Sequence, residues 1–385
     1  MHSGIPFCGM FAVVVFMIVA SSRNRYITLP DFRKIWLFMA LMAALFAFYF
    51  EPKDFINWDI KRYYEHLDNI RRFGLTEALK NTEYRTLYVT KYWMYLVSLT
   101  DMNGLFTAIP FFVEFIIFGY LVEDINKNRG NRLISIKKFG CVFFCWFSLM
   151  GVKLAITDVR CVFAMNVLAL AIYWDYICKR KRLISVVLYV MALYIHHVAS
   201  LVIAIRILLM FTKIIERPKL VLLGSMISYV LLFNVATFLV KSGNLFLRIS
   251  AKKLLADWAD YNFLQYFFSR EMSMKVLYLC FIGAFVLGLL LSQRARQTEK
   301  GQFDGRDINV LNLFSCLGIG FSFNYLLMER LLYPYAVVLT IFLLNHDDGR
   351  YLKRTIVFFT PILLYLLYFN DINGLLVNYL GFYIF

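Results

Sequence analysis

Apolar residues form long runs that recur along the whole chain and are separated by shorter polar segments. A helix that crosses a bilayer needs about 20 mostly apolar residues, within a range of about 17–25. The runs therefore predict about twelve crossings, several of them short. They lie near residues 4–20, 35–50, 103–122, 139–155, 161–178, 183–196, 198–212, 220–240, 274–292, 308–328, 331–345 and 355–369.

The polar segments that alternate with these runs are of two kinds, short basic ones and longer mixed ones. The basic segments, near 21–34, 123–138, 179–182, 213–219, 293–306 and 345–354, hold 23 of the 41 lysines and arginines. Lysine and arginine collect in cytoplasmic loops. This bias predicts that the N-terminus and the two long mixed segments, about 51–102 and about 241–273, lie outside.

One apolar stretch, from Tyr84 to Asp101, does not fit this alternation because it carries Arg85 and Lys91. Counting it as a crossing would invert every later loop and place the basic segments outside. We therefore expect an amphipathic helix that lies on the outer face or dips into it.

Composition supports a protein whose main solvent is lipid. Of the 385 residues, 61% are apolar and only 17% are charged, whereas about a quarter are charged in soluble proteins. This excludes an ordinary soluble enzyme, a disordered chain and a secreted disulfide scaffold. The sequence predicts an all-α polytopic membrane protein, with residues 1–385 forming a single integral membrane domain.

The net charge of +16 follows from the basic loops and does not require a nucleic-acid partner, since no recognised nucleic-acid motif is present. The seven cysteines form no C-x-x-C pair, so we expect no zinc site.

Charged and polar side chains next to lipid need a reason, because an ionised group at mid-membrane costs about 2.5–3.5 kcal/mol on insertion scales. Four such places fall on the predicted outer side. They contain Trp58, Asp59, Arg62 and Tyr63; Asp158 and Arg160; His196 and His197; and Glu329, Arg330 and Tyr333. Together they predict an outward-facing cavity for an anionic, polyhydroxylated substrate that is held in lipid.

Local spacing adds detail at these places. Asp59 and Tyr63 share a face if their segment is helical. Arg160 opens a predicted helix, where a cation opposes the helix dipole unless an anion lies near, and either Asp158 or a phosphate could be that anion. The adjacent histidines diverge by about 100° on a helix, which disfavours joint metal binding.

Two further charged residues, Glu114 and Arg206, lie deeper inside predicted helices. They could pair with each other or with a charge of the site, and either could equally be structural.

At these residues the chain resembles the EpsG family, which is related to the Wzy-type polymerases of O-antigen and exopolysaccharide. The segment from Asp59 to Tyr63 is similar to the family's Asp…Tyr element, and Glu83 begins a segment similar to its Glu…Leu element. The helix start Arg160-Cys-Val-Phe-Ala, the segment Ala-Leu-Tyr-Ile-His196 and a late Arg330 before a tyrosine also match. Cys161 replaces the usual glutamine and Val198 the usual serine.

The resemblance implies a GT-C-like glycosyltransferase in the bacterial cytoplasmic (inner) membrane, with its active site facing the periplasm or exterior. Its substrate would be an undecaprenyl-diphosphate-linked oligosaccharide, which is moved onto another lipid-linked repeat unit. The implied partners are the lipid bilayer and a chain-length regulator. No cofactor and no metal are expected.

The chemistry of a diphosphate leaving group then suggests roles for the candidate residues. Arg160 and Arg330 would clamp the phosphate oxygens, because arginine stays charged and offers paired donors. His196 would either donate to a phosphate oxygen or accept the proton of the acceptor hydroxyl, and Asp59 is the rival acceptor of that proton. Substrate-binding candidates are Trp58, Arg62, Tyr63, Glu83, Asp158, His197 and Tyr333.

Alternative functions remain open at this point. A polytopic transferase that takes sugar from a polyprenyl monophosphate would fit the acidic first loop, and such enzymes often need a metal. A flippase of lipid-linked oligosaccharide should show internal repeats and a mid-membrane site, and the sequence shows no internal symmetry. An O-acetyltransferase is a weaker option.

Overall fold

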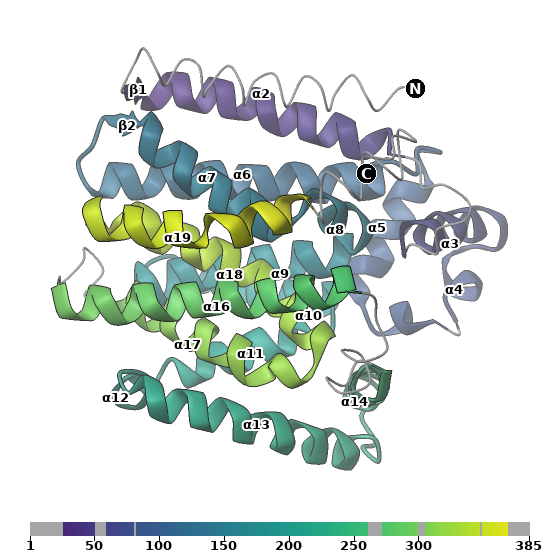
Figure 1. Ribbon diagram of the computed structural model, residues 1–385. Coiled ribbons are helices and arrows are strands. Elements are labelled where there is room, and N and C mark those ends of the chain that lie inside the picture. Colours follow the sequence, from purple (N-terminus) through teal and green to yellow (C-terminus); the bar gives the residue numbers. More distant parts are fainter. Residues whose placement is uncertain are drawn as a thin grey trace.

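The computed structural model describes residues 26–50, 59–80, 82–260, 272–298, 305–346 and 349–368. Most of this part of the chain is helical, and the long helices run side by side as one bundle (Figure 1). Two short antiparallel strands, β1 (Tyr26–Thr28) and β2 (Leu133–Ser135), pair with Tyr26 opposite Ser135.

The helices follow one another in chain order with short connections. The first half contains α2 (Leu29–Phe48), α3 (Asp59–Phe73), α4 (Leu75–Ala78), η1 (Glu83–Arg85), α5 (Tyr88–Ser98), α6 (Leu105–Asn128), α7 (Ile136–Met150), α8 (Val152–Thr157), α9 (Val159–Ile172) and the π-helix η2 (Tyr173–Ile177). The second half contains α10 (Arg182–Ile195), α11 (Ala199–Leu208), α12 (Thr212–Ile215), α13 (Pro218–Leu239), α14 (Leu245–Asp260), α16 (Met272–Thr298), α17 (Arg306–Gly320), η3 (Phe321–Phe323), α18 (Tyr325–Asn345) and α19 (Gly349–Leu367).

Five described helices are long and apolar enough to cross a membrane: α6, α9 with η2, α13, α16 and α18. The helices α10 and α11 are apolar but shorter. The expected all-α membrane architecture is therefore confirmed. The count of about twelve crossings stays a prediction, and the first predicted crossing lies outside the described residues.

Polar residues at the starts of several helices explain where they begin. The Thr28 hydroxyl accepts the backbone N–H of Asp31 at 3.3 Å, and Pro30 occupies the first turn of α2. The Asn324 side chain accepts the Leu327 N–H at 3.0 Å at the start of α18. Such caps satisfy amides that have no partner inside the helix.

The interior is rich in aromatic rings, and the helices differ in how far they are buried. Trp36 of α2 donates its indole N–H to the Phe115 carbonyl at 2.6 Å and contacts the ring of Phe118. Within the most apolar window of α18, 89% of residues are buried, against 19% for α13. The helix α18 is therefore central, and α13 lies at the edge of the bundle (Figure 1).

The two ends of the bundle have different contents. The helices α3, α4, α5 and α14 gather at one end, here called the α3 end, and β1, β2 and α12 lie at the opposite β end (Figure 1). The segment 59–106 has a small core of its own at the α3 end, which includes Tyr63, Leu67 and Met94. Within it, α5 has 11 residues and buries one face, as expected for the stretch from Tyr84 to Asp101.

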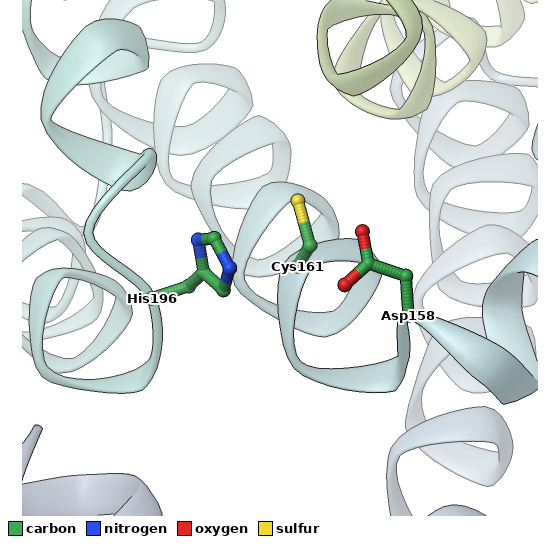
Figure 2. Close-up of side chains that lie close together, drawn as sticks. All are labelled: Asp158, Cys161 and His196. Carbon is green, nitrogen blue, oxygen red and sulfur yellow. The ribbon is translucent and has the colours of Figure 1, made fainter. Parts of the chain in front are cut away.

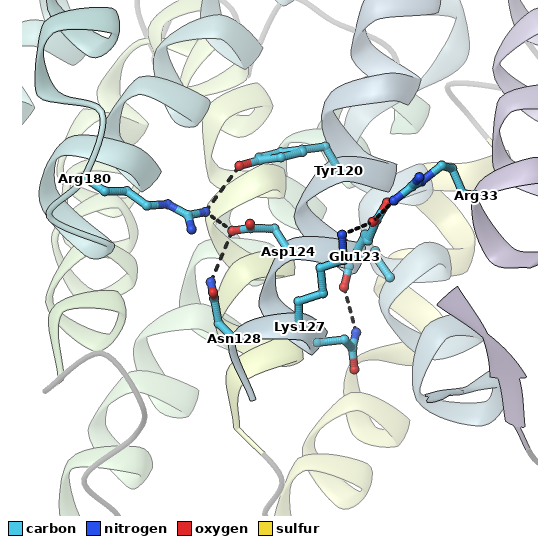
Figure 3. A network of polar contacts seen from close by, with 9 residues as sticks. Arg33, Tyr120, Glu123, Asp124, Lys127, Asn128 and Arg180 are labelled. Carbon is cyan, nitrogen blue, oxygen red and sulfur yellow. Dashed lines mark hydrogen bonds and ion pairs between the residues drawn. The ribbon is translucent and has the colours of Figure 1, made fainter. Parts of the chain in front are cut away.

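Polar contacts join the predicted cytoplasmic segments at the β end. Asp124 of α6 accepts a hydrogen bond from Arg180, and Glu123 pairs with Arg33 and Lys127 (Figure 3). Asp124 also accepts a hydrogen bond from the Tyr173 hydroxyl at 2.6 Å. Further links run from Arg296 to the Ile215 carbonyl, from Arg306 to the Tyr176 carbonyl and from Lys138 to the Leu344 carbonyl. The basic segments thus lie together, as the charge bias requires.

The structure does not pair Arg206 with Glu114 or with the site. Arg206 forms an ion pair with Asp175 of η2 at 2.5 Å, because both residues lie towards the β end. Glu114 is 1% exposed inside the bundle.

Candidate functional site

Several of the predicted site residues meet at the start of α9. Gly151 ends α7 with a φ of +66°, α8 follows, and Asp158 is the N-cap residue of α9. Arg160 therefore lies in the first turn of α9, where it is only 3% exposed. The sequence prediction that Arg160 opens a helix next to Asp158 is confirmed.

Two tyrosine rings from the α3 end hold the Arg160 guanidinium. Its central carbon lies 5.0 Å from the ring centroid of Tyr63 on α3 and 4.7 Å from that of Tyr84 in η1. A guanidinium is attracted to the face of an aromatic ring at such distances. The two uncharged rings therefore hold the buried, positively charged guanidinium in one orientation.

Tyr63 is itself enclosed, which changes the role expected for it. Its ring is 1% exposed and packs on Phe106. Burial raises the pKa of Tyr63 well above its ordinary value, although Arg160 acts in the opposite direction. The phenol therefore stays neutral, and its ring faces Arg160, whereas the sequence suggested that it would bind substrate directly.

His196 lies in the turn between α10, which ends at Ile195, and α11, which begins at Ala199. The break between the predicted crossings 183–196 and 198–212 is therefore a turn. The Val198 N–H donates to Nδ1 of His196 at 3.2 Å. The Thr90 hydroxyl of α5 donates to the Ile195 carbonyl at 2.9 Å, so the turn is tied to the α3 end.

This turn brings His196 next to the start of α9. One ligand-type atom from each of Asp158, Cys161 and His196 lies within 4.8 Å of the other two. Figure 2 shows the three side chains directed into the same space. We call this group the α9 cluster.

The residue types of the α9 cluster could suit a metal, but the tautomer of His196 does not. A neutral imidazole carries one N–H and one acceptor nitrogen. Because Nδ1 accepts the Val198 N–H, the proton resides on Nε2. A metal at Nε2 would move that proton to Nδ1, where it would oppose the Val198 N–H.

Arg330 and Tyr333 come from α18, one turn apart, and are 7% and 1% exposed. The structure places the preceding turn at Phe321–Asn324, so Glu329, Arg330 and Tyr333 lie within the helix and not at a turn as expected. The Tyr325 hydroxyl donates to Glu329 at 3.2 Å. The helix α18 packs against α9, whose start carries the α9 cluster.

Beside the cluster lies an apolar cavity of about 240 Å³. Its walls come from α11, α13, α14 and α18 and include Leu201, Leu232, Val235, Phe246 and Leu327. His197 and Arg330 also line it, and the His197 ring lies 4.8 Å from that of Phe246. Because His196 and His197 are consecutive, the cavity and the α9 cluster are neighbours.

The structure does not bring Asp59 and Arg62 into the α9 cluster. Asp59 and Arg62 form an ion pair at the start of α3, with side chains 36% and 66% exposed. Glu83 is in η1, but its side chain is not among those described, and Trp58 lies outside the described residues. Sequence reasoning missed Thr90 as a supporting residue and Tyr84 as a neighbour of Arg160, since neither contact has a local signal.

The Thr90 contact gives a prediction about positioning. The substitution Thr90→Val keeps the shape of the side chain but removes the hydrogen bond to the Ile195 carbonyl. Such a bond contributes about 1 kcal/mol, which corresponds to about fivefold in rate if the whole of this energy serves to position His196. We expect the activity that depends on His196 to fall several-fold, with the KM unchanged. The buried Thr340 bonds within its own helix, so Thr340→Val is the control. Wild-type activity in Thr90→Val would contradict the role.

Comparison with known proteins gives one positive result. The model of the EpsG family matches residues 33–380. No curated protein and no solved structure matches the chain. The match covers nearly the whole sequence, including Arg160, His196 and Arg330, and the chain therefore belongs to the EpsG family.

Proposed function

We propose that the chain is a polysaccharide polymerase that moves a lipid-diphosphate-linked glycan onto another lipid-linked repeat unit at the outer face of the membrane. Membership of the EpsG family suggests an exopolysaccharide or O-antigen polymerase in general. The observations that carry the finer proposal are buried Arg160 in the first turn of α9, next to the α9 cluster, and buried Arg330 in the lining of the apolar cavity.

The two arginines suit the leaving group of this reaction. Breaking the sugar–phosphate bond develops negative charge on the diphosphate oxygens, and fixed cations in a water-poor site stabilise that charge strongly. Arginine also matches phosphate oxygens with paired donors. The roles proposed for Arg160 and Arg330 follow from this chemistry.

The cavity suits the hydrocarbon part of the same substrate. Its walls are mostly aliphatic, and Arg330 and His197 lie in its lining. An isoprenoid chain placed there would have its phosphates near a cation. The proposed donor therefore has an apolar tail and an anionic head, in keeping with the cavity and the arginines.

A glycan gel from the host tests this function. We expect deletion of the gene to remove the polymer ladder while a single repeat unit is retained, and the wild-type gene on a plasmid to restore the ladder. Loss of every band, or lipid-linked units trapped inside the cell, would contradict a polymerase and favour an earlier transferase or a flippase. Loss of activity with EDTA would favour a transferase that uses a polyprenyl monophosphate.

A further inference from the structure

The proposed transfer needs a group that takes the proton of the acceptor hydroxyl, and the α9 cluster narrows the choice. Asp59 and His196 are the candidates from the sequence. Asp59 is directed at Arg62 in an ion pair at the exposed start of α3. A carboxylate held there lies outside the α9 cluster.

His196 faces the α9 cluster as a donor. Its Nδ1 accepts the Val198 N–H, which leaves the proton on Nε2. Of its two ring nitrogens, one is directed towards Cys161 and Asp158 and the other away from them (Figure 2). A nitrogen that already carries a proton cannot accept a second one from a hydroxyl.

Asp158 has the chemistry that is required. A carboxylate accepts hydrogen bonds and protons only. Although Asp158 is the N-cap residue, within the described chain the first-turn amides of α9 donate no hydrogen bond to its side chain. The carboxylate is turned towards Cys161 and His196 instead, and it is more exposed than either of them.

We propose that Asp158 is the catalytic base of the transfer and that His196 is a positioning residue, which donates its Nε2–H towards the Asp158 carboxylate. This inference rests on the proposed function. The Asp158 carboxylate takes the proton of the acceptor hydroxyl while the hydroxyl oxygen forms a bond to the anomeric carbon. The bond from that carbon to the diphosphate oxygen breaks, and its electron pair leaves with the lipid diphosphate. One direct displacement inverts the anomeric configuration.

The test uses full-length protein in proteoliposomes with a diphosphate-linked repeat unit as both donor and acceptor. We expect Asp158→Asn to lower transfer by about 10²–10⁴-fold, the usual contribution of a general base. His196→Gln should stay within about tenfold of wild type, since its amide N–H replaces the Nε2–H, whereas His196→Ala should fall further. Asp101→Asn is a matched control, because Asp101 is exposed at the α3 end and has a φ of +56° that asparagine tolerates.

Azide separates lost chemistry from lost folding. Azide needs no base, so it should attack the donor in Asp158→Ala and release lipid diphosphate with an inverted glycosyl azide. The same azide should not rescue Arg160→Ala, which lacks stabilisation of the leaving group. Rescue shows that the variant is folded and binds the donor.

Three results would overturn the assignment. These are near wild-type transfer by Asp158→Asn, a loss in His196→Gln as large as in Asp158→Asn, and a product with retained configuration. The absence of azide rescue in Asp158→Ala would also count against it. If the wild-type protein itself makes no polymer from the diphosphate donor, the proposed function fails, and this outcome is seen before any variant is compared.

Discussion

Replacing Arg160 with lysine is expected to abolish most of the glycan transfer. The positive charge is kept, but the planar guanidinium that lies over Tyr63 and Tyr84, and that we propose binds two phosphate oxygens, is lost. Removing one preorganised donor from a site of developing negative charge costs about 10²–10³-fold in rate. The measurement is polymer formed per unit time by protein in proteoliposomes, together with the ladder in a complemented deletion strain.

A matched control for this variant is found at the β end. Arg206 is partly buried, paired with Asp175 and, like Arg160, placed over an aromatic ring, that of Tyr176 at 5.3 Å. Arg206→Lys should therefore suffer a comparable loss of local packing without a comparable loss of transfer. Full activity in Arg160→Lys, or equal losses in the two variants, would contradict a clamp on the diphosphate.

Replacing Gly119 with alanine is expected to give a large loss of stability for so small a substitution. A Cβ atom at this position would lie inside the contact distance of Cδ1 and Nε1 of Trp36. The indole cannot easily move away because its N–H is bonded to the Phe115 carbonyl. Overpacking of this kind costs about 1–3 kcal/mol and occasionally more. Thermal unfolding of purified protein in detergent would show it as a lowered midpoint.

Gly140→Ala is the natural comparison, since Gly140 also lies inside an apolar helix but a Cβ atom added there would meet no neighbouring atom within 4 Å. Here the better helix propensity of alanine, worth about 1 kcal/mol, should leave stability unchanged or raised. Trp36→Phe should restore part of the stability lost in Gly119→Ala. If the two glycine variants unfold alike, the indole of Trp36 has room to move and the contact between α2 and α6 is loose.

The sequence predicted the architecture because long apolar runs and basic loops are local signals. The turn at His196 and the helix start at Arg160 were readable for the same reason, since each follows from a break in the apolar pattern. The break that the sequence predicts at Glu329 and Arg330, between the runs 308–328 and 331–345, lies too far along the chain. The charged pair suggests a turn there, but the helix α18 begins earlier, after its N-cap residue Asn324.

The neighbours of the site residues could not be predicted in this way. The contact of Arg160 with Tyr63 and Tyr84 joins segments that are far apart in the chain, and no spacing along the sequence reveals it. The tautomer of His196 depends on a backbone amide of Val198, whose direction is set only once the turn has formed. These two contacts alter the roles inferred for both residues. Tyr63 supports the guanidinium of Arg160, and His196 acts as a hydrogen-bond donor through its Nε2–H.

The position of α13 has a consequence for how the site is supplied. This helix forms one wall of the apolar cavity and is the least buried of the long apolar helices that the structure describes, so the cavity lies at the side of the bundle that borders the lipid. A donor carried in the bilayer would reach the site by diffusion within the plane of the membrane. Turnover would then follow the number of donor molecules per area of bilayer, whatever the volume of the surrounding water.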